Sequence, residues 1–318
     1  MAKVLPWCTG LEGGTNRVFD YVASTVTVSG AAARTGNYGV YITGFNSLAQ
    51  NDLVTPVTEL YMGQAFQPDG SGTCVAWYAN AVLLGSVKIS DLRKVEAYVG
   101  SNLVASSVQT YPLTGHHAVV ARVKIDDVTG VIQVWVDGNL FIDYSGDTKP
   151  GADSQIGAVR YGTGGWFDDI WMATSLISYD AKIVGLRPSA DGDLTEWTAF
   201  GGGSHYEKVR ETPPDDDTSY EYSTVGGNRV LYHIDDLDGA GKTILGINVT
   251  AVMAETAGSV GKTRILAKTG GTVYNGDDED LFITYSALNK FWATNPDTGV
   301  AWADADVDAL QIGVEDRS

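Results

Sequence analysis

The sequence has few cysteines and few basic residues. Cys8 and Cys74 are its only cysteines, which excludes a disulfide framework and leaves open whether these two residues pair. Lysine and arginine together number 21, against 39 aspartate and glutamate residues, so the formal net charge is −18. Phosphate backbones and anionic membrane surfaces repel such a chain. The composition therefore predicts that the chain has no nucleic-acid partner.

Long hydrophobic runs are also missing. No stretch approaches the roughly 20 apolar residues that a membrane-spanning helix needs. The opening residues MAKVLPWCTG lack the apolar core of a signal peptide. We therefore expect no membrane insertion. We also expect synthesis in a cytoplasm, where the protein stays or from which it leaves by a route that needs no signal.

The motifs that usually carry enzymatic chemistry do not occur. The four histidines lack the spacing of metal ligands, and the G-x-S-x-G turn of serine hydrolases is absent. So is Glu-x-Asp-x-x-Glu, which would bring two carboxylates together on one strand face for glycoside cleavage. The sequence therefore predicts that the chain is not an enzyme, has no catalytic residues and requires no cofactor.

What the sequence does have is alternation with a period of two, interrupted by turn residues. In the stretch from Val119 to Ile125, every second residue is apolar and falls on one face, whereas Arg122 and Lys124 fall on the other. The turn pair Asp137-Gly138 then separates VIQVWV from LFIDY, which predicts a three-stranded antiparallel meander. WFDDIW is expected to be a strand in which Asp168 and Asp169 face opposite ways.

Similar short strands, separated by glycine, asparagine, aspartate and serine, fill the whole chain. This pattern predicts an all-β protein with two β-sandwich (jelly-roll) domains in tandem. The texture changes at RPSADGDLTEW, so we place a boundary around residues 183–190. The first predicted domain covers residues 1–183 and the second covers residues 187–318. ADADVDAL near the end predicts a short helical turn before a last strand, LQIGV.

Two kinds of binding residue stand out. Exposed tryptophans can stack on sugar rings, which makes Trp135, Trp77 and Trp166 candidate glycan-binding residues, with core packing as the alternative. Oxygen-rich loops can hold calcium, with simple solvation as the alternative. The candidate calcium ligands are Asp191, Asp193, Asp215 and Asp217.

Several segments, taken in order, resemble a known family. TGLEGG, AARTGNYGVYI, HHAVVARVKIDDVTGVIQVWVDGNLFID and WFDDIWM are similar to the concanavalin A-like, laminin G-like jelly roll of tailed-bacteriophage virion proteins. Segments of residues 187–318, such as KTILGINVTAVMAE and LAKTGGTVY, resemble the second β-sandwich domain that follows this jelly roll in such proteins.

The resemblance implies a non-enzymatic structural component of a virion, in the tail, baseplate, fibre or head decoration. It implies assembly in the host cytoplasm and location in the virion. The partners that it implies are other virion proteins, a symmetric homo-oligomer in the particle and, as a further option, host surface glycans. The alternative hypothesis is a carbohydrate-binding lectin or adhesin module, and the third is a glycan hydrolase.

Overall fold

The computed structural model describes residues 3, 5–23, 25–43, 49–162, 164–239, 241–255 and 261–318. The chain divides into two compact units, Met1–Val184 and Gly185–Ser318, at a point inside the interval 183–190 that the sequence indicated. Strands are the main regular structure of both units, which confirms the predicted all-β class. Among the described residues, no helix has the length and apolar character needed to cross a membrane.

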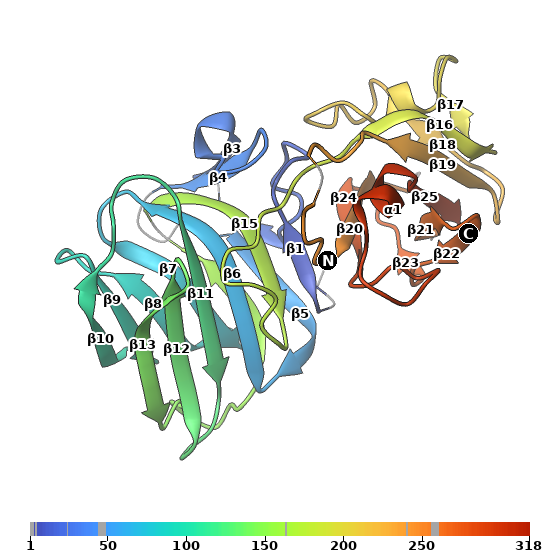
Figure 1. The fold of residues 1–318 in the computed structure, drawn as a ribbon. Coiled ribbons are helices and arrows are strands. Elements are labelled where there is room, and N and C mark those ends of the chain that lie inside the picture. Colours follow the sequence, from blue (N-terminus) through green and yellow to red (C-terminus); the bar gives the residue numbers. More distant parts are fainter. Residues whose placement is uncertain are drawn as a thin grey trace. The chain divides into compact units, whose positions relative to one another are not determined.

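Unit 1 is a sandwich of two antiparallel sheets (Figure 1). The first sheet has, in spatial order, β13 (Asn139–Gly146), β12 (Gly130–Val136), β11 (His117–Lys124), β6 (Glu59–Pro68), β15 (Gly165–Ala173), β4 (Gly39–Ile42) and β3 (Val26–Ser29), with β1 (Trp7–Thr9) paired to β15. The second has β10 (Asn102–Thr110), β9 (Lys94–Val99), β8 (Val82–Ile89), β7 (Gly72–Ala79), β14 (Ile156–Tyr161), β5 (Ala49–Val57) and β2 (Tyr21–Val22).

The predicted meander forms as expected, as β11, β12 and β13. Asp137 and Gly138 both have positive φ, 48° and 76°, which is the conformation that a tight hairpin turn between twisted strands requires. Alternation then decides which side chains enter the core. Val123, Ile132 and Ile142 are buried between the sheets, whereas the residues between them along each strand point to the outer face of the first sheet.

Unit 2 is built on one antiparallel sheet and two hairpins. The sheet has β16 (Pro188–Thr195), β19 (Arg229–Ile234), β25 (Gln311–Asp316), β21 (Lys262–Thr269) and β22 (Thr272–Asn275), with β23 (Glu279–Asp280) paired to β21. The hairpins are β17 (Thr198–Ala199) with β18 (Glu221–Tyr222), and β20 (Ile247–Met253) with β24 (Ser286–Trp292). Ala251 and Met253 of β20 pack on the buried cluster Val230, Tyr232 and Val314, so this hairpin forms a second layer over the sheet.

Helical structure is limited to short pieces in the described part of the chain. These are the 3₁₀ turns η1 (Gly30–Ala32) and η2 (Tyr206–Lys208) and the helix α1 (Asp304–Asp308). The helix α1 confirms the helical turn predicted before the last strand, and it begins with Ala303 N donating to the Asp306 carboxylate at 2.9 Å. The last strand is β25, which lies in the middle of its sheet.

Candidate functional site

The outer face of the first sheet carries a row of polar side chains. The register places Arg122 of β11 opposite Tyr61 of β6 on one side and opposite Gln133 of β12 on the other. Gln133 in turn lies opposite Asp143 of β13. Together with Glu59, which begins β6, these residues form a strip across four neighbouring strands. We call Glu59, Tyr61, Arg122, Gln133 and Asp143 the polar row.

Hydrogen bonds connect the polar row from end to end. Arg122 Nε donates to Glu59 Oε1 at 2.8 Å, and Arg122 Nη1 donates to Gln133 Oε1 at 2.9 Å. Gln133 Nε2 then donates to Asp143 Oδ1 at 2.8 Å. The guanidinium carbon of Arg122 lies 5.7 Å from the centre of the Tyr61 ring. These contacts hold the planar side chains in fixed positions on the sheet.

The polar row keeps hydrogen-bonding capacity for a ligand. A guanidinium has five N–H donors, and the bonds of Arg122 to Glu59 and Gln133 use two of them. The hydrogen bond to Glu59 raises the pKa of Arg122, so this side chain stays charged. The Arg122 and Glu59 side chains are 29% and 34% exposed, and Asp143 is exposed. The row is therefore an ordered polar surface that water or a ligand can reach.

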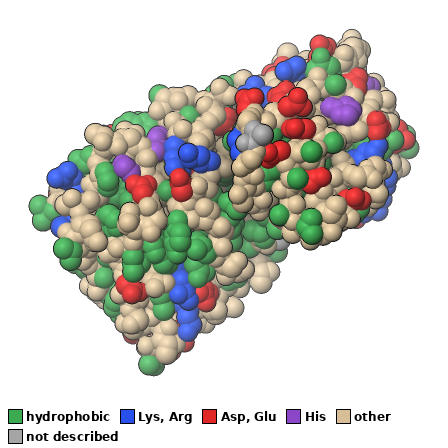
Figure 2. Space-filling view, in the orientation of Figure 1, with side chains coloured by type: hydrophobic (Ala, Val, Ile, Leu, Met, Phe, Trp, Pro, Cys, Tyr) green, Lys and Arg blue, Asp and Glu red, His purple; other side chains and the backbone are tan. Residues whose placement is uncertain are grey.

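An aromatic side chain lies beside the row. Trp135 is two residues after Gln133 on β12 and points to the same outer face, where it is partly buried. It packs on the buried cluster of Val120, Trp171 and Ala173. The ring of Tyr179 lies 5.2 Å from the Trp135 ring at an angle of 51°. Figure 2 shows hydrophobic side chains grouped on this face of unit 1, with acidic and basic side chains next to them.

Tyr179 belongs to the segment 174–184, which we call the cover segment. Ile177 and Ala181 of this segment pack on the same cluster as Trp135. Two carboxylates fix its far end: Asp169 Oδ1 accepts the Ile183 N–H at 2.7 Å, and Arg34 bridges Asp169 and Asp180. The cover segment is thus held by the packing of Ile177 and Ala181 and by the polar contacts of Asp180 and Ile183.

Asp168 and Asp169 differ from the expectation that they face opposite ways. The β-bulge between Asp168 and Trp171 breaks the alternation, Asp169 takes a positive φ of 49°, and both carboxylates are buried. Asp168 Oδ2 accepts the backbone N–H groups of Arg34 and Thr35 at 2.7 and 3.0 Å. The pair therefore ties β15 to the loop after η1, as well as to the cover segment.

Burial, reinforced by the charge of Asp169, raises the pKa of Asp168 to about 7. An ordinary aspartate has a pKa near 3.9, so the folded state holds this proton more tightly than the unfolded state does. The stability contributed by Asp168 is fully present below about pH 4 and is lost as the pH rises through about 7. We expect the stability of the wild type, measured relative to Asp168→Asn, to be greater at pH 5.5 than at pH 8. Urea unfolding of both proteins at the two pH values tests this, and an equal difference at both would contradict it.

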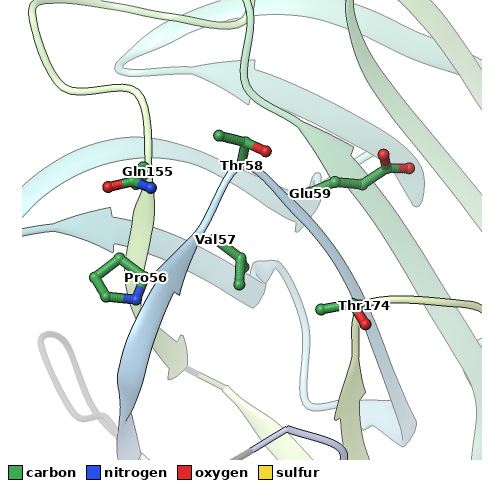
Figure 3. A pocket seen from close by; sticks show the side chains of 6 residues that line it. All are labelled: Pro56, Val57, Thr58, Glu59, Gln155 and Thr174. Atoms are coloured by element: carbon green, nitrogen blue, oxygen red, sulfur yellow. The ribbon is translucent and has the colours of Figure 1, made fainter.

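A depression of ≈ 350 Å³ adjoins one end of the polar row (Figure 3). It is lined by Pro56, Val57, Thr58, Glu59, Gln155 and Thr174. In Figure 3, Pro56 and Gln155 lie on one side of the turn between β5 and β6, and Glu59 and Thr174 lie on the other. Glu59 belongs to both features, so the depression and the polar row are continuous. The volume is at the lower end of the range of small-ligand pockets.

The three predicted glycan-binding tryptophans have different surroundings. The prediction for Trp77 is wrong, because this residue is 1% exposed and lies in the core, where Gly85 leaves room for its ring. Trp166 is partly buried and stacks on Tyr41, with ring centres 4.7 Å apart and an angle of 15°. It lies opposite Gln67, whereas Trp135 is level with Gly63, four residues along β6. The structure thus does not bring Trp135 and Trp166 together.

The four predicted calcium ligands do not form a group. Among the described residues, no cluster of three or more histidine, cysteine, aspartate or glutamate side chains is placed to hold a metal ion. Asp193 pairs instead with Lys268, and Asp191 Oδ1 accepts the Tyr206 N–H at 2.8 Å. Asp215 bonds Ser219, and Asp217 Oδ1 accepts the Tyr285 hydroxyl at 2.9 Å. Local bonding thus accounts for each of these carboxylates.

The structure answers the question that the two cysteines left open, because no disulfide bond joins Cys8 to Cys74. Cys74 is buried in the core, where Gln64 Nε2 lies 2.6 Å from its sulfur. Cys8 packs against the cluster of Val120, Trp171 and Ala173 on the outer face. Burial raises the pKa of both thiols, that of Cys8 to about 12, so neither is a reactive thiolate near neutral pH.

No protein-family model and no curated protein sequence matches the chain. Solved structures match about half of it. The endo-β-1,4-glucuronan lyase of the fungus Trichoderma reesei is 18% identical, with 51% of this chain and 93% of that chain covered and a TM-score of 0.42. The carbohydrate-binding module CBM66 from Bacillus subtilis is 8% identical, with 47% and 95% covered and a TM-score of 0.32. The Caenorhabditis elegans galectin LEC-6 is 9% identical, with 42% and 94% covered and a TM-score of 0.31.

These matches correct one prediction. Enzymes stand among them, such as the glucuronan lyase and an alginate lyase, which contradicts the prediction that the chain is not an enzyme. At these identities and TM-scores the likeness concerns the β-sandwich fold alone, so the function proposed below depends on the residues of the outer face.

Proposed function

We propose that unit 1 binds carbohydrate on the outer face of its first sheet, at the polar row and Trp135. The observation that carries the proposal is the hydrogen-bonded strip Glu59–Arg122–Gln133–Asp143 beside a partly exposed tryptophan. This corresponds to the lectin or adhesin hypothesis of the sequence analysis.

The chemistry of a sugar ring fits this surface. Its hydroxyl groups both donate and accept hydrogen bonds, so they need neighbouring donors and acceptors in fixed positions. The polar row offers donors on Arg122 and Gln133 and acceptors on Glu59 and Asp143. The apolar C–H face of a sugar needs an aromatic ring, which Tyr61 offers within the row and Trp135 offers beside it. The side chains are held by each other, so binding requires little additional ordering.

The depression next to Glu59 extends this surface beyond the strands. A ligand lying along the polar row would reach Thr58 and Gln155 at its Glu59 end. Both residues carry polar groups suited to hydroxyls. We therefore propose an oligosaccharide as the ligand, with one ring at Trp135 and a further ring toward the depression.

Replacing Arg122 by alanine is expected to weaken glycan binding about 10- to 100-fold, because the hydrogen bonds of a charged group contribute about 1.5–3 kcal/mol. The measurement is binding of the labelled full chain to a glycan panel and to bacterial envelopes, with and without calcium, followed by titration calorimetry with the best ligand. The comparison with and without calcium also tests whether calcium takes part in glycan binding.

Arg160→Ala is the matched control for this variant. Arg160 also bonds a glutamine, through Nε to Gln50 Oε1 at 2.6 Å, and also lies over a tyrosine, Tyr78, at 3.8 Å. However, it belongs to β14 in the second sheet. Its loss should leave the affinity unchanged. Equal weakening by both variants, or a wild type that binds no glycan under either condition, would overturn the proposal.

The virion location remains a separate prediction from the sequence resemblance. A glycan-binding face is compatible with that location, because a particle surface can contact cell-surface sugars. Mass spectrometry of purified phage particles for peptides of this chain would test it independently of the binding experiment.

A further inference from the structure

The short strands β17 and β18 of unit 2 turn aromatic side chains outward. The register places Ala199 opposite Glu221, and both point inward, because Ala199 is buried and the Glu221 side chain is 2% exposed. The pairing continues by one step beyond the strands, since the N–H group of Phe200 donates to the Tyr220 carbonyl at 3.0 Å. Alternation therefore places Phe200, Tyr220 and Tyr222 on the outer face. We call these three residues the aromatic patch.

The rings of the aromatic patch are ordered and exposed. Phe200 and Tyr220 stack, with ring centres 4.5 Å apart and an angle of 13°, and the Tyr222 ring lies 6.1 Å from the Tyr220 ring. Phe200 is 45% exposed and Tyr222 is 42% exposed. In Figure 1, β17 and β18 lie at the upper right of unit 2. The patch thus offers aromatic faces that are already held in position to a ligand from solution.

An acidic run, Asp215–Asp217, precedes the aromatic patch in the loop that joins the two strands. Ser219, which comes directly before Tyr220, donates its N–H group to the first carboxylate of this run at 3.0 Å. The Tyr285 hydroxyl donates to the last carboxylate at 2.9 Å. Burial, and then the bond and charge of that carboxylate, raise the pKa of Tyr285 to about 12, with further contributions from Asp216 and Tyr220. The acidic run therefore adjoins the patch in space as well as in sequence.

Unit 2 carries most of the negative charge of the chain. Residues 185–318 contain 23 aspartate and glutamate residues and 10 lysine and arginine residues, so unit 2 has a net charge of −13 out of the total of −18. A surface of this kind attracts cations and repels anions. Charge complementarity therefore favours a cationic ligand at the aromatic patch over a neutral or an anionic one.

We propose that the aromatic patch and the acidic run bind an arginine side chain of a basic partner segment. A guanidinium fits both features, because its plane stacks on aromatic rings and its N–H groups donate to carboxylates. A carboxylate can accept about four hydrogen bonds, so the bond from Tyr285 leaves Asp217 able to accept others. The chain itself uses this stacking in unit 1, where the Arg160 guanidinium lies 3.8 Å from the centre of the Tyr78 ring.

Fluorescence anisotropy of a short labelled peptide of alternating glycine and arginine, titrated with the full chain, tests the proposal. Two further peptides replace every arginine by lysine or by citrulline, the uncharged isostere of arginine. The arginine peptide should bind about 3- to 10-fold more tightly than the lysine peptide, because the guanidinium stacks and donates in a planar fork. The citrulline peptide should not bind. Equal binding of the arginine and lysine peptides would overturn the proposal, because net charge alone would then decide binding.

Variants of the patch locate the binding. Phe200→Ala and Tyr222→Ala should each weaken binding of the arginine peptide about 3- to 10-fold. Tyr21→Ala is the control and should leave the affinity unchanged, because Tyr21 is also an exposed aromatic residue, at 57%, but belongs to β2 of unit 1. Unchanged affinity in both patch variants, or equal weakening in all three variants, would overturn the proposal. Circular dichroism shows that each variant is folded, and the comparison of peptides on the wild type does not depend on the variants.

Discussion

Asp169→Ala is expected to lower the free energy of unfolding of unit 1 by about 3–5 kcal/mol. The carboxylate is 1% exposed and accepts the Thr35 hydroxyl at 2.6 Å and the Ile183 N–H at 2.7 Å. It also faces the Arg34 guanidinium at 3.3 Å. Alanine would leave the Ile183 N–H without its carboxylate acceptor, and Arg34 would keep only the exposed Asp180 as a partner. Removing one partner of a buried charge pair is strongly destabilising. Urea unfolding followed by tryptophan fluorescence measures the loss.

Asp180→Ala is the control for this variant, because Asp180 pairs with the same Arg34 but is 54% exposed. Exposed ion pairs contribute about 0–1 kcal/mol, so this variant should stay near the wild type. A loss below 1 kcal/mol in Asp169→Ala would mean that the cover segment is held by packing alone. In that case Tyr179 would keep its place beside Trp135 without the carboxylate.

The fold of the meander could be predicted because its signals are local. Alternation along β11 and β12 assigned each side chain to a face, and Asp137-Gly138 marked the turn between β12 and β13. The same pattern placed Arg122 on the outer face. It did not reveal the site, because Tyr61 and Glu59 lie about 60 residues away in sequence, and only the register of β6 with β11 brings them to Arg122.

The tryptophans show the same limit. Trp135 alternates with buried residues on β12, so its partly exposed position followed from the pattern. Trp77 lies on β7, where Val75 and Ala76 point to opposite faces and are both buried. The apolar sequence of β7 therefore does not indicate that either face is exposed. In such a strand, the sequence pattern does not distinguish a buried tryptophan from one that binds a ligand. The bulge at Asp168 is equally hidden, because an extra residue in a strand reverses the alternation without a sequence signal that we recognised.

Unit 2 also has a buried carboxylate that joins separate strands, as Asp169 does in unit 1. It is Glu221 of β18, whose side chain is 2% exposed. Its carboxylate accepts the Tyr232 hydroxyl at 2.5 Å and lies 2.5 Å from His205 Nδ1. Burial raises the pKa of Glu221, while the bond from Tyr232 and the nearby His205 act against this. The side chain thus links the short hairpin of β17 and β18 to β19, which carries Tyr232.

Glu221→Ala is expected to lower the stability of unit 2 by about 2–4 kcal/mol, because the buried Tyr232 hydroxyl and His205 would both lose their carboxylate. Glu221→Gln should cost less, since its amide oxygen still accepts the Tyr232 hydroxyl. Glu207→Ala, an exposed residue of η2, should change the stability by no more than about 0.5 kcal/mol. Hydrogen exchange measured on peptides from β17, β18 and β19 locates the effect. Faster exchange there in Glu221→Ala alone supports the link. Unchanged exchange would mean that ring contacts of Tyr220 with Phe200 and Tyr222 hold the hairpin without the carboxylate.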